Sequence, residues 1–178
     1  MKKTTLSNGV RILTKNMPFV RSVSMGVWVN VGARDESASE NGLSHLIEHM
    51  IFKGTRKRTA FQIAKEFDAI GGHTNAFTSF ENTCYHARVM DTHFNTMVDI
   101  LTDIFLNSEF AEEEVVKERP VIFQEISMVE DNPEEYLHVL SGRAFWGDNP
   151  LGRSILGTRE NILAFTSEKI KTFFNRFY

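Results

Sequence analysis

Hydrophobic and polar residues follow two different periods along the chain, and the change of period locates the first strands and helices. Between residues 23 and 31 every second residue is apolar: Val23, Met25, Val27, Val29 and Val31. Because successive side chains of a strand point to opposite faces, this segment predicts a long strand with one apolar face. An Asn-Gly pair at residues 8–9 precedes another apolar stretch, which predicts a tight turn into a strand over 10–15.

Helical spacing replaces the alternation after residue 41. Apolar residues then recur at intervals of three and four, at Leu43, Leu46, Ile47 and Met50. This spacing predicts a helix near 41–52, which ends at Gly54. Thr59 is a typical N-cap for a second helix, which the Gly71-Gly72 pair ends.

Two further strands and four further helices are predicted beyond residue 73. Strands over 74–79 and 83–90 are expected to form a hairpin. Asp91 is a candidate cap for a helix that reaches Asn107, and Ser167 for a last helix that is still running at Tyr178. Between them we expect helices over 112–129 and from Pro133 toward Phe145.

The order of these elements predicts an α+β fold, with a mixed, mainly antiparallel sheet that carries helices on one face. Pro120 stands inside the predicted helix 112–129, where a proline costs about 3 kcal/mol or forces a kink, so we expect a bend near 116–120. A chain of this pattern should return to its sheet after the last helix. We therefore expect the sequence to be the first part of a longer polypeptide, truncated before its last strands.

Composition narrows the function classes. The chain has 178 residues, of which 42% are hydrophobic, and a net charge of −3 without any basic cluster, which argues against nucleic-acid binding. Its apolar runs are too short to span a bilayer, and Thr4 and Thr5 stand where a signal peptide would be apolar, so we expect a cytoplasmic protein. A single cysteine, Cys84, excludes an internal disulfide and fits a reducing compartment.

The most informative motif is His45-Leu46-Ile47-Glu48-His49. Histidines at i and i+4 lie one above the other on a helix, so both imidazoles can reach one metal ion. Glu48 projects beside them, where a carboxylate can take a proton from a water at the metal. The order H-x-x-E-H is the inverse of the common metallopeptidase motif. The alternative is two core or surface histidines that happen to lie one turn apart.

The residues alone leave the third metal ligand open between two candidates. None of the other histidines is an obvious choice, whereas Glu118 and Glu125 lie seven residues apart, and thus on one helix face, within apolar sequence. A carboxylate on a mostly buried helix needs a partner, and a metal with its histidines is a suitable one. The alternative is two solvent-facing glutamates on an amphipathic helix.

The segment His45–Thr55 closely resembles the active-site helix of the pitrilysin, insulysin and mitochondrial processing peptidase family of zinc metallopeptidases. Other segments resemble this family in the same order: Leu6–Arg11 its opening strand, Gly71–Ser79 its substrate strand, Glu118–Glu125 its two-glutamate helix, and Asn149–Gly152 with Ile155–Thr158 a later loop. The resemblance covers essentially the whole chain and is closest to bacterial processing-peptidase-like subunits.

The resemblance implies roles for the motif residues. His45, His49 and Glu125 would bind one Zn²⁺, and Glu48 would be the general base. Glu118 would orient a ligand histidine. The residues Asn75, Ala76 and Phe77 would lie on an exposed edge strand, to which an extended peptide adds as a further strand.

Family subunits contain two related halves, so the resemblance implies that residues 1–178 are a single zinc-binding, catalytic half-domain at the N-terminus of a longer subunit. We then expect a zinc-dependent endopeptidase for unfolded or extended peptides, whose partners are the C-terminal half and a second subunit in a homodimer or heterodimer. The fragment alone is expected to be inactive. Two alternatives stay open: a non-catalytic scaffold or partner subunit, and a metal-binding or peptide-binding module without turnover.

Overall fold

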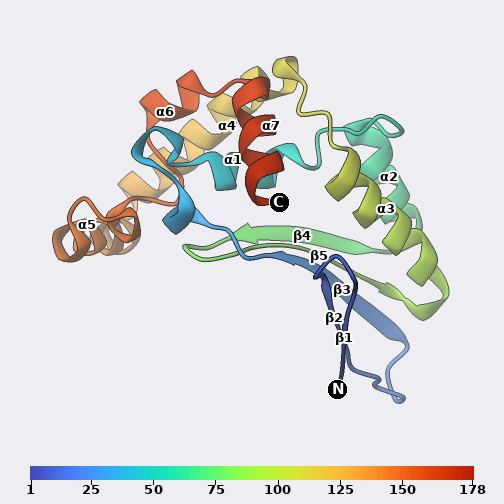
Figure 1. Ribbon diagram of the computed structural model, residues 1–178. Coiled ribbons are helices and arrows are strands. Elements are labelled where there is room, and N and C mark those ends of the chain that lie inside the picture. Colours follow the sequence, from blue (N-terminus) through green and yellow to red (C-terminus); the bar gives the residue numbers. More distant parts are fainter.

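The computed structural model describes residues 1–178 and places helices over one face of a three-stranded antiparallel sheet (Figure 1). The strands are β3 (Ser22–Val29), β5 (Thr83–Met90) and β4 (His73–Thr78), in the order β3-β5-β4. Both pairings are antiparallel, which confirms the predicted hairpin and leaves β4 at one edge of the sheet.

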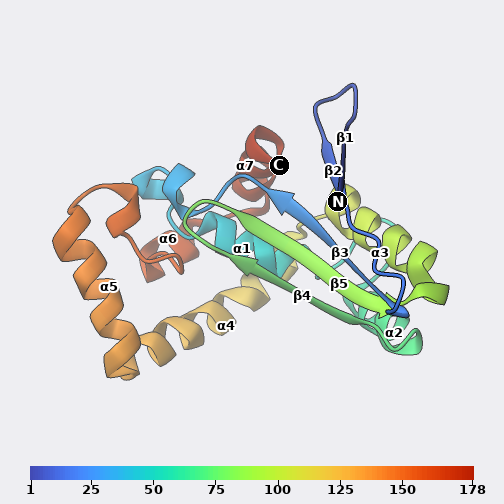
Figure 2. The ribbon, with the colours of Figure 1, turned by 90° about the horizontal axis from the view of Figure 1, so that it is seen from below.

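A second, two-stranded sheet forms at the N-terminus. Strands β1 (Lys2–Thr5) and β2 (Arg11–Thr14) pair in antiparallel fashion around the predicted Asn-Gly turn, where Gly9 has a φ of +90°. Figure 2 shows this hairpin projecting from the rest of the molecule. Every residue of both strands is exposed, so the hairpin contributes nothing to the core.

Most of the helices lie on one side of the three-stranded sheet, and α5 (Pro133–Trp146) lies beyond its end (Figure 1), an arrangement that confirms the predicted α+β class. In chain order they are α1 (Leu43–Met50), α2 (Ala60–Ala69), α3 (Phe94–Asn107), α4 (Glu112–Asp131), α5 (Pro133–Trp146), α6 (Arg159–Ala164) and α7 (Ser167–Phe177). None of them combines the length and the apolar character needed to cross a membrane. Only α6 was not expected from the sequence.

The main hydrophobic core surrounds α1. Leu43, Leu46, Ile47 and Met50, which set the helical period, have no exposed surface. They belong to one buried cluster that also takes in side chains of β5, α4 and α7. A smaller cluster joins α2 and α3 to β5. Because α1 is packed between the sheet and other helices, the side chains that it carries start from a fixed backbone.

Two predicted helix caps are wrong. Asp91 does not cap α3, which begins at Phe94; its carboxylate pairs with Arg21 instead, with Nε 2.8 Å from Oδ2. The cap of α7 is Thr166, one residue before the predicted Ser167, and its side chain accepts the backbone N–H of Lys169. The predicted cap of α2 is confirmed, because Thr59 accepts the N–H of Gln62.

Helix α4 continues through Pro120. A proline inside a helix leaves the carbonyl four residues earlier without its usual donor. Here that carbonyl belongs to Val116, and both Val116 and Pro120 are exposed, so water can take the place of the missing N–H. The helix therefore tolerates the proline, while the bend expected near 116–120 stays a prediction.

Candidate metal centre

Helix α1 carries both histidines of the H-x-x-E-H motif and is anchored at its first turn by a buried carboxylate. Glu36 Oε2 accepts the backbone N–H of Gly42 at 2.8 Å, and Oε1 accepts that of Ser44 at 2.7 Å. Burial raises the pKa of Glu36, although these hydrogen bonds favour its charged form. A carboxylate in this position satisfies the free N–H groups and the positive end of the helix.

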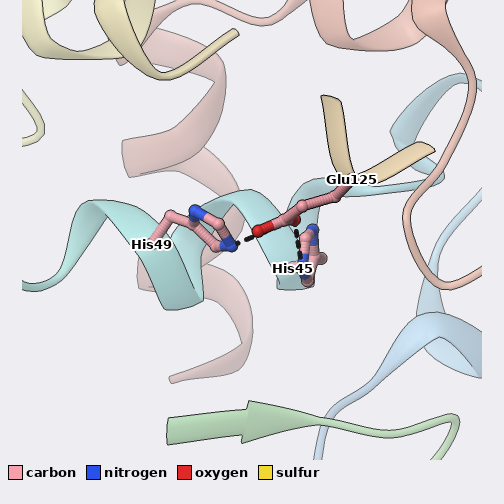
Figure 3. A group of neighbouring side chains, drawn as sticks. All are labelled: His45, His49 and Glu125. Carbon is pink, nitrogen blue, oxygen red and sulfur yellow. Dashed lines mark ion pairs between the residues drawn. The ribbon is translucent and has the colours of Figure 1, made fainter. Parts of the chain in front are cut away.

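His45 and His49 lie one turn apart on α1, with ring centroids 4.6 Å apart. Glu125 reaches them from α4, and its Oε2 lies 3.5 Å from Nε2 of each histidine (Figure 3). One ligand atom from each of the three residues lies within 4.8 Å of the other two. The fold thus brings together the three residues that the sequence singled out as metal ligands.

The spacing and burial of these atoms fit a zinc ion. Two ligands of a tetrahedral zinc, with bonds of about 2.0–2.1 Å, lie roughly 3.3 Å apart, close to the 3.5 Å between Glu125 Oε2 and each Nε2. Glu125 Oε2 is also buried without a hydrogen-bond partner, a costly state for a carboxylate oxygen. Two imidazoles and one carboxylate leave a fourth position open, as in catalytic zinc sites.

Glu118 contacts the ring nitrogen of His49 that does not face Glu125. Its Oε1 lies 2.8 Å from His49 Nδ1, and its Oε2 lies 2.6 Å from Lys53 Nζ. Although burial opposes ionisation, the hydrogen bonds from His49 and Lys53 hold the pKa of Glu118 below its usual range. An ionised Glu118 favours a proton on His49 Nδ1, which leaves Nε2 free to bind a metal.

The two histidines have opposite pKa shifts. Burial, followed by the neighbouring His49, lowers the pKa of His45 to about 4, so its imidazole is neutral near pH 7. Burial also acts to lower the pKa of His49, but the hydrogen bond to Glu118 and the nearby carboxylates outweigh it, so that pKa is raised. The neutral imidazole of His45 is already the form that binds metals.

Glu48 lies on α1 next to the three-residue group but is not one of its members. Its Oε2 accepts a 2.6 Å hydrogen bond from the hydroxyl of Thr78, at the end of β4. Burial raises the pKa of Glu48, although hydrogen bonding from Thr78 and the charge of His49 oppose this effect. Glu48 is thus a half-buried carboxylate held beside the histidines by the sheet.

The residues expected to bind peptide lie on an open strand edge. Asn75, Ala76 and Phe77 belong to β4, which pairs with β5 on one side only. The side chains of Asn75 and Phe77 are exposed, whereas Ala76 is half-buried. Helix α1 packs against β4, so this edge adjoins the proposed ligands.

Sequence reasoning gave no role to three residues that contact this site. Glu36 lies six residues before the N-cap Gly42, outside the N-cap and N3 positions at which capping residues are recognised in a sequence, so no local signal indicated it. Lys53 and Thr78 each contact a carboxylate on a different element. Nothing in the linear sequence indicates these contacts, because they depend on how the elements pack.

Comparison with known proteins supports the interpretation of this site as a metal centre. Residues 11–159 match the model of the family described as Insulinase (Peptidase family M16). The chain is 46% identical to the uncharacterized zinc protease YmxG of Bacillus subtilis and 45% identical to the uncharacterized zinc protease SCO5738 of Streptomyces coelicolor. Both matches cover 100% of this chain but only 44% and 39% of the relatives, so the chain spans about two fifths of their length.

Solved structures of bacterial proteases share the fold. A protease from Helicobacter pylori superposes with a TM-score of 0.94 at 24% identity, over 99% of this chain and 43% of that one. The first half of the periplasmic protease PqqL from Escherichia coli gives a TM-score of 0.89 at 22% identity, over 99% of this chain and 40% of that one. At these identities the likeness establishes the α+β fold.

Proposed function

Since this chain belongs to the insulinase family of peptidases (Peptidase family M16), we propose that it contributes the metal centre of a zinc-dependent endopeptidase that hydrolyses unfolded or extended peptides. The observation that carries the proposal is the convergence of His45, His49 and Glu125 at the spacing of zinc ligands, with Glu48 on the same helix. Its curated relatives are bacterial zinc proteases.

The side chains of the site divide the work of hydrolysis. His45 and His49, through Nε2, and Glu125, through Oε2, would hold the zinc ion, and Glu118 would keep the ring of His49 in its binding orientation. A bound zinc ion lowers the pKa of a water toward 7 and polarises a carbonyl. Glu48 would accept a proton from the attacking water and deliver it to the leaving amine, so no covalent intermediate with the protein is needed.

The open edge of β4 favours an extended peptide as substrate. The outer backbone N–H and C=O groups of an edge strand can pair with a further strand, which a folded substrate does not offer. Asn75 and Phe77 would then contact substrate side chains, and the small side chain of Ala76 would allow close approach of a backbone. The peptide would lie beside α1, which packs against β4.

The activity is proposed for the longer protein, because the chain spans about two fifths of its curated relatives. We propose that residues 1–178 form its N-terminal, zinc-binding half, that a C-terminal half closes the site, and that the subunits form a homodimer or heterodimer. The cytoplasmic location expected from the sequence stays a prediction, which fractionation of cells would check.

The proposal is tested on the full-length protein with flexible peptides of mixed sequence. We expect one zinc per subunit, cleavage that a chelator abolishes, and recovery on addition of zinc. His49→Ala should lose both metal and cleavage, whereas His138→Ala, which removes an exposed histidine of α5, should lose neither. A protein that contains no zinc and cleaves no peptide would contradict the proposal and favour the scaffold alternative.

A further inference from the structure

We propose that Thr78 is a positioning residue for Glu48, whose hydroxyl holds the carboxylate at the metal centre and ties it to the strand on which the peptide docks. This inference rests on the proposed function, because it concerns the residue that would act as general base. It adds a role for a side chain that belongs neither to the ligand set nor to the H-x-x-E-H motif.

The contact between the two side chains is direct and short. Thr78 Oγ1 donates to Glu48 Oε2 at 2.6 Å, and both side chains are half-buried. The other acceptor near this hydroxyl is the carbonyl of Ser44, at 3.5 Å. A hydroxyl has one proton to donate, and a charged acceptor at the shorter distance forms the stronger bond.

Glu48 has no other anchor among side chains. The core fixes the backbone of α1, but a glutamate side chain still rotates about several bonds. Thr78 is the only side chain that donates a hydrogen bond to Glu48, which takes part in no ion pair. A general base must lie within hydrogen-bond reach of the proton it takes, and a misplacement of about 1 Å can cost roughly 10²-fold in rate.

The position of Thr78 on β4 relates the base to the substrate. Thr78 is the last residue of the strand, directly after Asn75, Ala76 and Phe77, and the whole strand pairs with β5. As a β-branched residue it has few χ1 rotamers, so its hydroxyl is held firmly by the backbone. A peptide paired with β4 and the carboxylate of Glu48 would both take their positions from one strand.

The test compares variants of the full-length protein for zinc content, kcat and KM on a flexible peptide. Thr78→Val keeps the branched shape but removes the donor, and should lower kcat about 10- to 100-fold, as loss of a supporting contact does, with KM and zinc content unchanged. Thr78→Ser keeps the hydroxyl and should restore most of kcat. Thr102→Val is the control, since Thr102 lies on α3 rather than on the docking strand and its hydroxyl donates only to backbone carbonyls of its own helix.

Two further comparisons separate positioning from mere structural support. Serine and alanine at position 78 differ only by the hydroxyl, so Thr78→Ala should be slow where Thr78→Ser is not, even if the valine variant misfolds. In a Glu48→Gln background, Thr78→Val should cause no additional loss, because the hydroxyl acts through the carboxylate.

Equal rates for the serine and alanine variants, or a wild-type kcat for Thr78→Val, would overturn the role of Thr78. An additional loss in the Glu48→Gln background would also overturn it. Failure of the proposed function has a different signature: the unmodified protein would lack zinc-dependent cleavage, and Glu48→Gln would change nothing. The unmodified protein and Glu48→Gln are therefore measured in the same series as the Thr78 variants.

Discussion

Glu48 differs from the neighbouring ligand candidates because it would move a proton rather than hold the metal. We expect Glu48→Gln to retain zinc and to lose about 10²- to 10⁴-fold in kcat, because the amide has nearly the same shape but cannot accept the proton. Zinc content and turnover should be measured on one preparation of the full-length protein. Glu130→Gln, an exposed change on α4, serves as control. Activity within a few-fold of the unmodified protein would remove Glu48 from this role.

The sequence predicted the arrangement of site residues that are close to one another along the chain, but not the contacts between residues of different helices. His45, Glu48 and His49 stand on one helix turn, so spacing alone indicated their chemistry. Glu118 and Glu125 were recognised as a pair on one face, but only packing against α1 shows that Glu125 reaches both histidines while Glu118 contacts His49 and Lys53. The wrong cap at Ser167 has a similar cause, since the adjacent Thr166 is also a good cap and backbone geometry decides between them.

At the scale of elements, α4 presents two glutamates to α1 in different ways. We expect Glu125→Ala to lower zinc affinity far more than Glu118→Ala, because the first removes a proposed ligand and the second an orienting contact worth about 10- to 100-fold. Titration with zinc against a competing chelator measures both. Glu113→Ala, at the exposed start of α4, should leave the affinity unchanged. The reverse order for Glu118 and Glu125 would show that their roles are exchanged.

The turn that follows α1 is held to α3 by a buried carboxylate. Asp103 accepts hydrogen bonds from Arg58 at 2.7 Å, Thr55 at 2.8 Å and Asn107 at 2.9 Å, and only 3% of its surface is exposed. Burial acts to raise the pKa of Asp103, but these donors outweigh it, so the pKa is lowered. Arg58 also pairs with Glu66 and Asp99, so loss of the Asp103 charge should cost less than the roughly 3 kcal/mol lost when a buried charge is left without any partner.

The lowered pKa of Asp103 makes this contribution depend on pH. An acid with a depressed folded pKa stabilises the protein fully above its unfolded pKa of about 3.9, and the effect disappears as pH falls through the folded value. The free energy of unfolding of Asp103→Asn should therefore be lower than that of the unmodified protein near neutral pH, and the two should converge in strong acid. Denaturant titrations across this range test it, with exposed Asp131→Asn as control. A difference independent of pH would contradict the assignment.

Elements with a strong hydrophobic period were predicted with nearly correct bounds, whereas β1 and α6, which lack one, were missed. Strand β3 and helices α1 and α3 each bury one periodic face, which is what the pattern reports. Strand β1, with the sequence Lys-Lys-Thr-Thr, has no apolar face and exists through its pairing with β2. Helix α6 spans only six residues, too few to show a period.

At the scale of the whole molecule, the strand order and the single helical layer depend on contacts between distant segments. Strand β5 follows β4 in the chain but lies between β3 and β4 in the sheet, where it pairs with both. This strand order places β4 at an edge of the sheet. Periodicity predicts each strand but not its neighbours. The resemblance to a known family supplied the expectation of an edge strand, and the fold confirms it.

The chain also leaves apolar side chains uncovered around its N-terminal hairpin. The exposed fractions are 99% for Phe19, 62% for Leu13 and 60% for Met17. A two-stranded hairpin is marginally stable in water unless other structure packs on it. We therefore propose that the remainder of the longer protein covers this region, and expect the 178-residue chain by itself to self-associate.

The same chain should bind zinc and yet hydrolyse peptides poorly. Its ligand candidates and Glu48 all lie within residues 1–178 and converge in this fold, so the metal centre can form without the rest of the protein. Catalysis needs more, because holding a peptide in reactive geometry can supply about 7–11 kcal/mol of barrier reduction, and we propose that the C-terminal half supplies part of this positioning. Zinc titration and a peptide assay should compare the chain with the full-length protein, and with its Glu48→Gln variant as the inactive reference. Turnover equal to that of the full-length protein would show that β4 and α1 alone position the substrate.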